Sequence, residues 1–184
     1  MNYGIYNEKL TIILVSFHSN HIIENLINTL EKNIRIIVIE NSLNNEIKTY
    51  LEKKFKNVQV IIPKENLGQG GGINLGLSFV KTEFSLYLDI DTVPDQDMIE
   101  ILLKNAEKIK NFSILAPKVK NFNYTDELYI EHNKDKNCHK MKFITGCALL
   151  FNMKILNIGS INHTLHNIRI YFRQNNLFYS KIPY

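Results

Sequence analysis

The sequence has few of the features that mark secreted or membrane-spanning proteins. Only two of its 184 residues are cysteines, Cys138 and Cys147, which is too few for the disulfide framework of a small secreted domain. No apolar stretch approaches the roughly 18 residues that a membrane-spanning helix needs. No secretory signal pattern precedes the first apolar run. We therefore expect a cytoplasmic protein that does not cross a bilayer.

Charge of one sign is not concentrated anywhere along the chain. The net charge of +4 comes from scattered lysines rather than from a basic block, which argues against nucleic-acid binding. A slightly basic surface is compatible with anionic ligands and with peripheral association with a membrane. The composition, 45% hydrophobic and 22% charged, is typical of a globular protein, and we expect residues 1–184 to form a single domain. No pattern predicts an oligomeric state.

Short apolar runs rich in β-branched residues alternate with amphipathic stretches. Strands are predicted at residues 11–17, 35–40, 58–62, 84–88 and 113–116. The intervening stretches have apolar residues at three- and four-residue spacing, which is typical of helices. Ser19 or Asn20 is expected to cap the first of these. The alternation predicts an α/β fold in which helices flank a mostly parallel central sheet.

The pattern changes after residue 117. Residues 118–140 are mostly polar around a short apolar segment at 128–130, which indicates a variable loop with an edge strand. Strand character returns at 141–152, and a short helix is expected at 153–158.

Two aspartates, Asp89 and Asp91, follow the apolar run at 84–88. The carboxyl ends of strands are where α/β sheets bind ligands. Alternate residues of an extended strand point the same way, so we expect both carboxylates to converge on one divalent cation and the phosphate that it carries. The competing interpretation is an acidic turn between strand and helix, with Asp95 capping the helix.

A glycine-rich segment at residues 68–72 leads into the next predicted helix. Its spacing matches neither the dinucleotide-binding pattern G-x-G-x-x-G nor the Walker A pattern. Glycines just before a helix let a ligand approach the backbone, and the helix N-terminus favours negative charge. The alternative is a flexible turn that serves packing only.

Taken in order, these segments resemble the family-2 glycosyltransferases of the GT-A type. The matching segments are residues 11–19, V-I-E-N-S at 38–42, N-L-G-Q-G-G-G-I-N-L-G at 66–76, L-Y-L-D-I-D at 86–91, and F-I-T-G-C-A at 143–148. The resemblance implies a GT-A-like Rossmann-type sandwich, with a nucleotide-binding part at about residues 10–117 and an acceptor-side part at about 118–184.

The same resemblance implies an activity. It is the metal-dependent transfer of a sugar, with inversion, from a nucleotide-diphospho-sugar donor to a glycan or lipid-linked acceptor, in surface polysaccharide or glycoconjugate biosynthesis. Asp91 would bind Mg²⁺ or Mn²⁺ bridging the diphosphate, and Glu40 would take the base-contacting role that the family usually gives to Asp. The other nucleotide-sugar contacts implied are Ser16, Phe17, Asn66, Gly70, Gly71, Gly72, Asn74 and Asp89.

The general base is where the chain departs from the family. An inverting transfer needs a group that takes the proton of the acceptor hydroxyl. Relatives usually carry an acidic pair after the glycine-containing strand, but residues 158–163 and 171–177 contain no carboxylate. Relatives also usually continue beyond the position of Tyr184. Either the base lies elsewhere, or the chain is a shortened or degenerate copy that binds a donor without transferring its sugar. The candidates for the base are Asp126, Glu127, Glu131 and His163.

Overall fold

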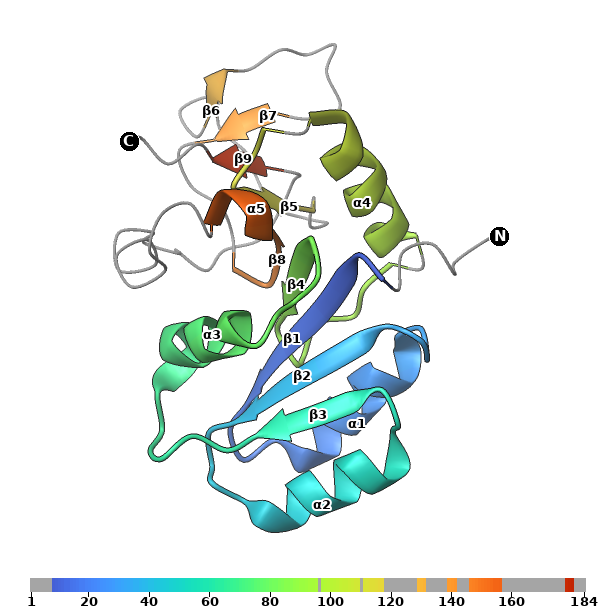
Figure 1. Ribbon diagram of the computed structural model, residues 1–184, viewed down its shortest axis with the longest axis vertical. Coiled ribbons are helices and arrows are strands. Elements are labelled where there is room, and N and C mark those ends of the chain that lie inside the picture. The colour runs from blue at the N-terminus through green and yellow to red at the C-terminus, as the bar shows by residue number, and fades with distance from the viewer. Residues whose placement is uncertain are drawn as a thin grey trace. The chain divides into compact units, whose positions relative to one another are not determined.

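The computed structural model describes residues 8–95, 97–109, 111–117, 129–131, 139–141, 146–156 and 178–180. Of residues 129–131, 139–141 and 178–180 it describes the backbone only. The chain divides into two compact units, Met1–Val93 and Pro94–Tyr184 (Figure 1). The prediction of a single domain stays a prediction.

A parallel sheet forms the centre of the first unit. Its strands have the order β3-β2-β1-β4. Their bounds are β1 (Leu10–Ser16), β2 (Arg35–Glu40), β3 (Val58–Ile61) and β4 (Phe84–Leu88). Nearly every side chain of β1 and β4 is buried, because helices cover both faces of the sheet. The predicted bounds of β2 and β4 are confirmed.

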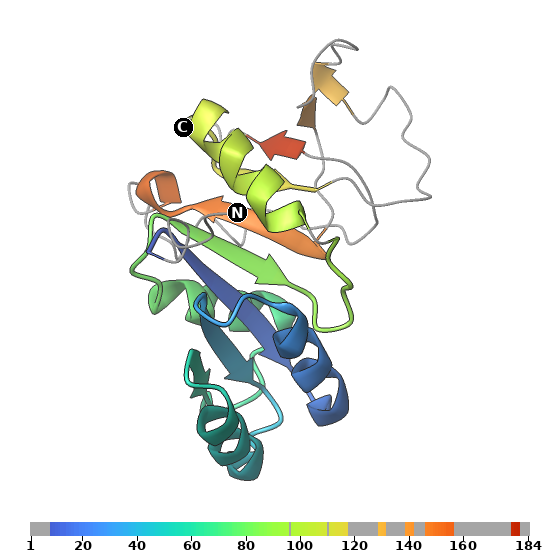
Figure 2. The same ribbon diagram turned by 90° about the vertical axis from the view of Figure 1, so that its right-hand side faces the viewer.

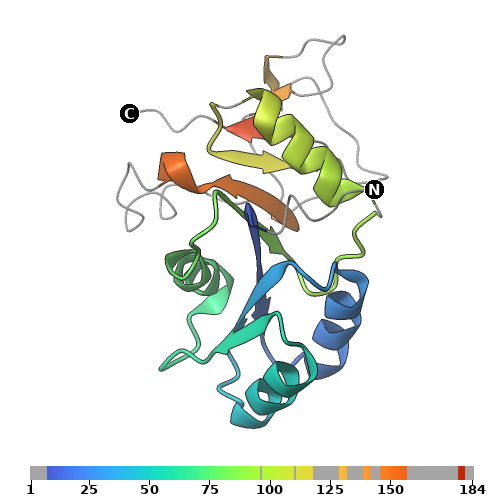
Figure 3. The ribbon, with the colours of Figure 1, turned by 45° about the vertical axis from the view of Figure 1, so that its right-hand side comes forward.

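Two helices cover one face of this sheet and one helix covers the other (Figure 3). The helices α1 (Asn20–Thr29) and α2 (Asn45–Lys54) lie on the same side, and α3 (Gly68–Ser78) lies on the opposite side. Asn44 caps α2, because its Oδ1 accepts hydrogen bonds from Glu46 N at 2.9 Å and Ile47 N at 3.3 Å.

The predicted N-cap position of α1 is confirmed, because Ser19 is the N-cap residue. Its side chain does not cap the helix, since its hydroxyl donates to the carbonyl oxygen of Phe17 at 2.7 Å. The backbone carbonyl of Ser19 accepts from Ile22 N at 3.0 Å, so the first turn is held by the main chain.

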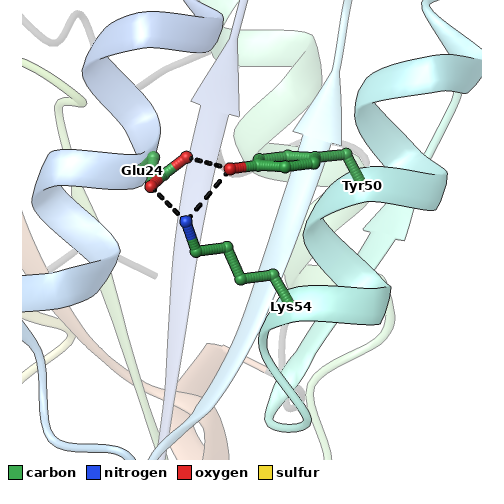
Figure 4. Close-up of polar contacts among 3 residues, drawn as sticks. All are labelled: Glu24, Tyr50 and Lys54. Carbon is green, nitrogen blue, oxygen red and sulfur yellow. Dashed lines mark hydrogen bonds and ion pairs between the residues drawn. The ribbon is translucent and has the colours of Figure 1, made fainter.

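A cluster of three polar side chains joins α1 to α2 (Figure 4). Tyr50 OH donates to Glu24 Oε2 at 2.6 Å, and Lys54 Nζ donates to Glu24 Oε1 at 2.5 Å and to Tyr50 OH at 3.0 Å. The hydrogen bond from Lys54 lowers the pKa of the Glu24 carboxyl, and the same bond raises the pKa of Lys54. The cluster lies at the surface, where ion pairs are screened by water and contribute little to stability.

The glycine-rich segment is part of a helix and not a loop before one, which corrects the sequence-based interpretation. Helix α3 begins at Gly68, so Gly70, Gly71 and Gly72 lie in its first turns. The missing side chains allow α3 to approach β1 closely. A Cβ placed on Gly72 would lie 2.8 Å from Val15 Cγ1. Packing therefore explains at least this glycine.

The second unit contains mostly antiparallel strand pairs. Its strands have the order β8-β5-β9-β7-β6. Their bounds are β5 (Ile114–Ala116), β6 (Tyr129–Glu131), β7 (His139–Met141), β8 (Ala148–Asn152) and β9 (Phe178–Ser180). Strand β5 pairs antiparallel with β8 and β9, β6 pairs antiparallel with β7, and β7 pairs parallel with β9.

The described part of the second unit also contains two helices, α4 (Met98–Ile109) and α5 (Met153–Leu156). Helix α4 packs along β5 through a buried face made by Leu102, Leu103 and Ala106 (Figure 2). The strand character predicted at 141–152 is found at Met141, the end of β7, and from Ala148, the start of β8, and a turn at Gly146 and Cys147 directly precedes β8. Glycine weakens the interior of a strand and often marks such an interruption.

The predicted α/β class is thus confirmed, with a parallel sheet flanked by helices in the first unit. None of the helices in the part of the chain that the structure describes is long and apolar enough to cross a membrane.

Candidate nucleotide site

Polar side chains gather at the carboxyl edge of the parallel sheet in the first unit. Strand β1 ends at Ser16 and β2 at Glu40, and these two residues lie opposite each other in the strand register. Strand β4 ends at Leu88 and continues into the turn that contains Asp89 and Asp91. In a parallel sheet all these ends meet at one edge, which is where such sheets bind ligands.

Asp89 connects the turn after β4 to the first turn of α3. Its Oδ1 accepts hydrogen bonds from Gln69 Nε2 at 2.7 Å and from the hydroxyl of Tyr87. Gln69 Nε2 also donates to Tyr87 OH at 2.7 Å, so the three side chains form a closed set of hydrogen bonds. The aspartate and the glycine-rich segment, which are some 20 residues apart in the sequence, are therefore in direct contact.

Burial is the largest cause of the pKa shifts of Asp89 and Tyr87. It raises the pKa of the Asp89 carboxyl, and the nearby charge of Asp91 raises it further, while the hydrogen bonds from Tyr87 and Gln69 oppose the shift. Burial also raises the pKa of the Tyr87 hydroxyl, and the charge of Asp89 adds to this effect. Tyr87 therefore stays protonated at neutral pH and remains a hydrogen-bond donor.

Asp91 is exposed, and it does not lie on an extended strand as the sequence predicted. Thr92 N donates to the carbonyl oxygen of Asp89 at 3.0 Å, which closes a turn directly after β4. We expected Asp89 and Asp91 to point the same way as alternate residues of an extended strand. This expectation is wrong, because the strand ends at Leu88, before both aspartates. The turn instead separates a half-buried Asp89 from a solvent-facing Asp91.

Glu40 is fully buried at the end of β2. Its Oε1 accepts hydrogen bonds from the backbone N of Ser42 at 2.9 Å and from the hydroxyl of Ser42. Its Oε2 and the hydroxyl of Ser16 are both buried and have no hydrogen-bond partner among the described residues. Unpaired buried polar groups are costly and rare in proteins. These two lie on neighbouring strands at the edge where parallel sheets bind ligands.

Asn41 fastens the start of α3 to β2. It is buried, its Nδ2 donates to the carbonyl oxygen of Gly68 at 3.0 Å, and its Oδ1 accepts from Leu67 N at 3.4 Å. Asn66 adds a local bond, because its Oδ1 accepts from Gly68 N at 2.8 Å. Gly68 has a φ of 64°, a left-handed conformation that glycine adopts without strain.

Two non-glycine residues in the turns at this edge also have left-handed backbones. They are His18 after β1, with a φ of 51°, and Leu43 after β2, with a φ of 61°. Such conformations are uncommon outside glycine and cluster at binding sites. Phe17, just before His18, is half exposed, and the two rings contact each other with centroids 4.3 Å apart. An exposed aromatic ring here can stack on a flat ligand group.

The remaining predicted residues have different surroundings. Gly70 is exposed, whereas Gly72 is buried against β1. Asn74 lies on α3, and its Oδ1 is buried without a partner among the described residues. The candidate bases Asp126, Glu127 and His163, and the side chain of Glu131, lie outside the residues that the structure describes.

Sequence reasoning did not assign a role to Tyr87, Gln69 or Asn41. A signal for Tyr87 was present, because a residue two positions before Asp89 lies on the same face of a strand. Gln69 gave no comparable signal, since its contact depends on how α3 packs against the sheet.

The acids at this edge suit a divalent cation that arrives with its substrate. Nowhere in the described ranges do three or more histidine, cysteine or acidic side chains form a group able to hold a metal ion. An exposed carboxylate can supply one oxygen ligand of such an ion, and a diphosphate and water can supply the rest. Asp91 is the exposed acid of this turn that could take this role.

The sequence matches the model of the family described as glycosyl transferase family 2 over residues 11–159. No curated protein matches it. Solved structures do match, among them residues 1–349 of TarS from S. aureus in complex with UDP-GlcNAc, at 14% identity and a TM-score of 0.62, covering 95% of this chain and 59% of that one.

Another solved structure that matches is the mannosyltransferase PcManGT from Pyrobaculum calidifontis in complex with GDP-Man and Mn²⁺. It has 13% identity and a TM-score of 0.62, and the match covers 84% of this chain and 47% of that one. The chain thus spans about half the length of these structures. At these identities the structural likeness establishes a shared fold, and it confirms the predicted GT-A architecture. Because the family model covers most of the sequence, this chain belongs to glycosyl transferase family 2.

Proposed function

We propose that the chain binds a nucleotide-diphospho-sugar at the carboxyl edge of its parallel sheet and transfers the sugar to a glycan or lipid-linked acceptor. The contact between Asp89 and Gln69 is the observation that carries this proposal. It brings the acidic turn after β4 together with the first turn of α3. The N-terminus of a helix favours the negative charge of phosphate. The two matched structures contain GDP-Man and UDP-GlcNAc, which are both nucleotide-diphospho-sugars, the class of donor proposed for this chain.

The base of the nucleotide is proposed to bind at Ser16, Phe17 and Glu40. The unpaired Oε2 of Glu40 is an acceptor for a ring N–H group, and both uracil and guanine carry such a donor. The half-exposed ring of Phe17 can stack on the base.

The ribose and the diphosphate are proposed to lie between α3 and the turn after β4. Asp89 accepts a hydrogen bond from the ribose, and the backbone at Asn66 and Gly70 borders the phosphates. Asp91 is exposed, and its carboxylate would hold Mg²⁺ or Mn²⁺. When bound, the ion stabilises the negative charge that develops on the nucleoside diphosphate as the bond to the sugar breaks.

A second candidate function is a module that binds the nucleotide sugar but does not transfer the sugar. It is favoured by the absence of carboxylates from residues 158–163 and 171–177, where relatives usually carry their acidic pair. If the chain transfers the sugar, the proposed general base is one of four residues, Asp126, Glu127, Glu131 or His163.

Calorimetry and a transfer assay distinguish these functions. UDP, GDP, UDP-GlcNAc and GDP-mannose are titrated into the protein with Mn²⁺ and with EDTA, and the labelled sugars are then incubated with the protein and a panel of glycan and lipid-linked acceptors. We expect one nucleotide to bind more tightly when Mn²⁺ is present. Nucleotide binding together with a labelled product supports the transferase. Nucleotide binding without labelled product and without hydrolysis of the nucleotide sugar supports the binding module. No binding of any of the four compounds would refute both.

A further inference from the structure

Tyr87 has a hydroxyl group that packing alone does not explain. The side chain is 1% exposed near the end of β4, where phenylalanine would fill nearly the same volume without a polar group to satisfy. Its hydroxyl donates to Asp89 Oδ1 and accepts from Gln69 Nε2 at 2.7 Å. Burying a hydroxyl here is favourable only because both partners are present.

The hydrogen bonds engage one oxygen of Asp89 and leave the other for a ligand. Both donors, Tyr87 OH and Gln69 Nε2, bind Oδ1. No described residue donates to Oδ2. A carboxylate held through one oxygen keeps one rotamer, so the second oxygen has a defined direction before a ligand binds. Preorganisation of this kind lowers the entropic cost of binding.

The same bonds couple two segments that the nucleotide is proposed to contact. Tyr87 and Asp89 belong to β4 and its turn, whereas Gln69 belongs to the first turn of α3. Asn41 fixes that turn from the other side through Gly68 and Leu67. These side-chain hydrogen bonds therefore tie the acidic turn to the helix N-terminus, in addition to the packing of α3 against β1.

We propose that Tyr87 and Gln69 are positioning residues for nucleotide binding, which hold Asp89 so that its Oδ2 meets the ribose of the donor. This inference rests on the proposed function. Neither residue touches the nucleotide. Their effect on affinity passes through Asp89 and does not depend on the metal that Asp91 would hold.

The test measures the affinity of the full chain for UDP and for GDP by calorimetry, with Mn²⁺ and with EDTA. Tyr87→Phe removes one hydroxyl, and we expect it to weaken nucleotide binding roughly tenfold under both conditions. Gln69→Met, which keeps the length of the side chain but removes its donor, should have a similar effect. Tyr50→Phe is the matched control, because it removes a tyrosine hydroxyl that bonds to Glu24 far from this edge. It should leave the affinity unchanged.

A double-mutant cycle separates positioning from a general effect on the fold. In the Asp89→Ala background, Tyr87→Phe and Gln69→Met should cause no further loss of affinity. Unchanged affinity of both variants in the wild-type background, or an equal loss with and without Asp89, would overturn the inference. If Tyr87→Phe does not fold, Gln69→Met alone decides, because its side chain is only partly buried. Failure of the wild-type chain to bind either nucleotide would instead refute the proposed function, and this inference with it.

Discussion

At the scale of single residues, the site contains buried polar groups that lower the free energy of unfolding. Asp89 is half buried, and burial raises the pKa of its carboxyl, so its charge is destabilising in the folded state. Glu40 Oε2 and the hydroxyl of Ser16 are buried without partners among the described residues. Such groups are expected where a ligand completes the interactions. Binding sites commonly trade stability for function in this way.

Asp89→Asn should stabilise the protein while weakening nucleotide binding. The pKa of Asp89 is higher in the folded than in the unfolded chain, so the folded state binds more protons and stability falls as pH rises through the window between these two values. Asparagine removes this dependence, and its Oδ1 still accepts from Tyr87 and Gln69. Thermal unfolding at pH 4 and pH 7 should show a larger advantage of the variant at pH 7. An advantage that is no larger at pH 7 than at pH 4 would contradict the assignment of the destabilising charge to Asp89.

Asp91→Ala should abolish the tighter nucleotide binding caused by Mn²⁺ and leave the fold intact. The side chain is exposed, so its removal should change the free energy of unfolding by no more than about 0.5 kcal/mol. Calorimetry with UDP and GDP, with and without Mn²⁺, measures the first effect, and denaturant unfolding measures the second. An unchanged response to Mn²⁺ would exclude Asp91 as the metal ligand.

At the scale of elements, the first turns of α3 combine two roles. Residues at its N-terminus are proposed to border the nucleotide, while Gly72 and Gly76 let the helix lie close to β1. A Cβ on Gly76 would lie 2.7 Å from Ile13 Cγ2, and one on Gly72 would lie 2.8 Å from Val15 Cγ1. Valine and isoleucine have restricted side-chain rotamers, so they cannot easily move aside.

Gly72→Ala and Gly76→Ala should therefore each destabilise the protein by about 1–3 kcal/mol, because the added methyl group overpacks the interface between α3 and β1. Gly70→Ala is the matched control, since no atom lies within 4 Å of the position of its Cβ. That change should stabilise the helix by about 0.5–1 kcal/mol, because alanine loses less backbone entropy than glycine. Urea unfolding of the three variants measures these effects, and equal values for all three would show that α3 does not pack as described.

At the scale of the whole molecule, all the described residues proposed to bind the nucleotide lie in the first unit, Met1–Val93. We therefore expect UDP or GDP with Mn²⁺ to slow amide hydrogen exchange in the turns after β1, β2 and β4 and in the first turn of α3. Hydrogen-exchange mass spectrometry of the full chain with and without ligand measures this. Slower exchange confined to residues 94–184 would place the nucleotide elsewhere.

The sequence by itself predicted which helices and strands form in the first unit and in which order they follow one another along the chain. Apolar runs, β-branched residues and helical spacing predicted β2 and β4 at their observed bounds, since these are local signals of burial. The aspartate pair after β4 was recognisable for the same reason, because a short polar motif directly follows a buried strand. The antiparallel pairing of β5 with β9 gave no local signal, as it joins residues more than 60 positions apart.

Only the tertiary structure decided how the site is built. It put Gln69 and Tyr87 on Asp89, buried Glu40 beside Ser16, and made part of the glycine-rich segment a packing surface against β1. Each of these depends on contacts between residues distant in the sequence. Local patterns determine which elements form, whereas the close packing of those elements determines which side chains meet.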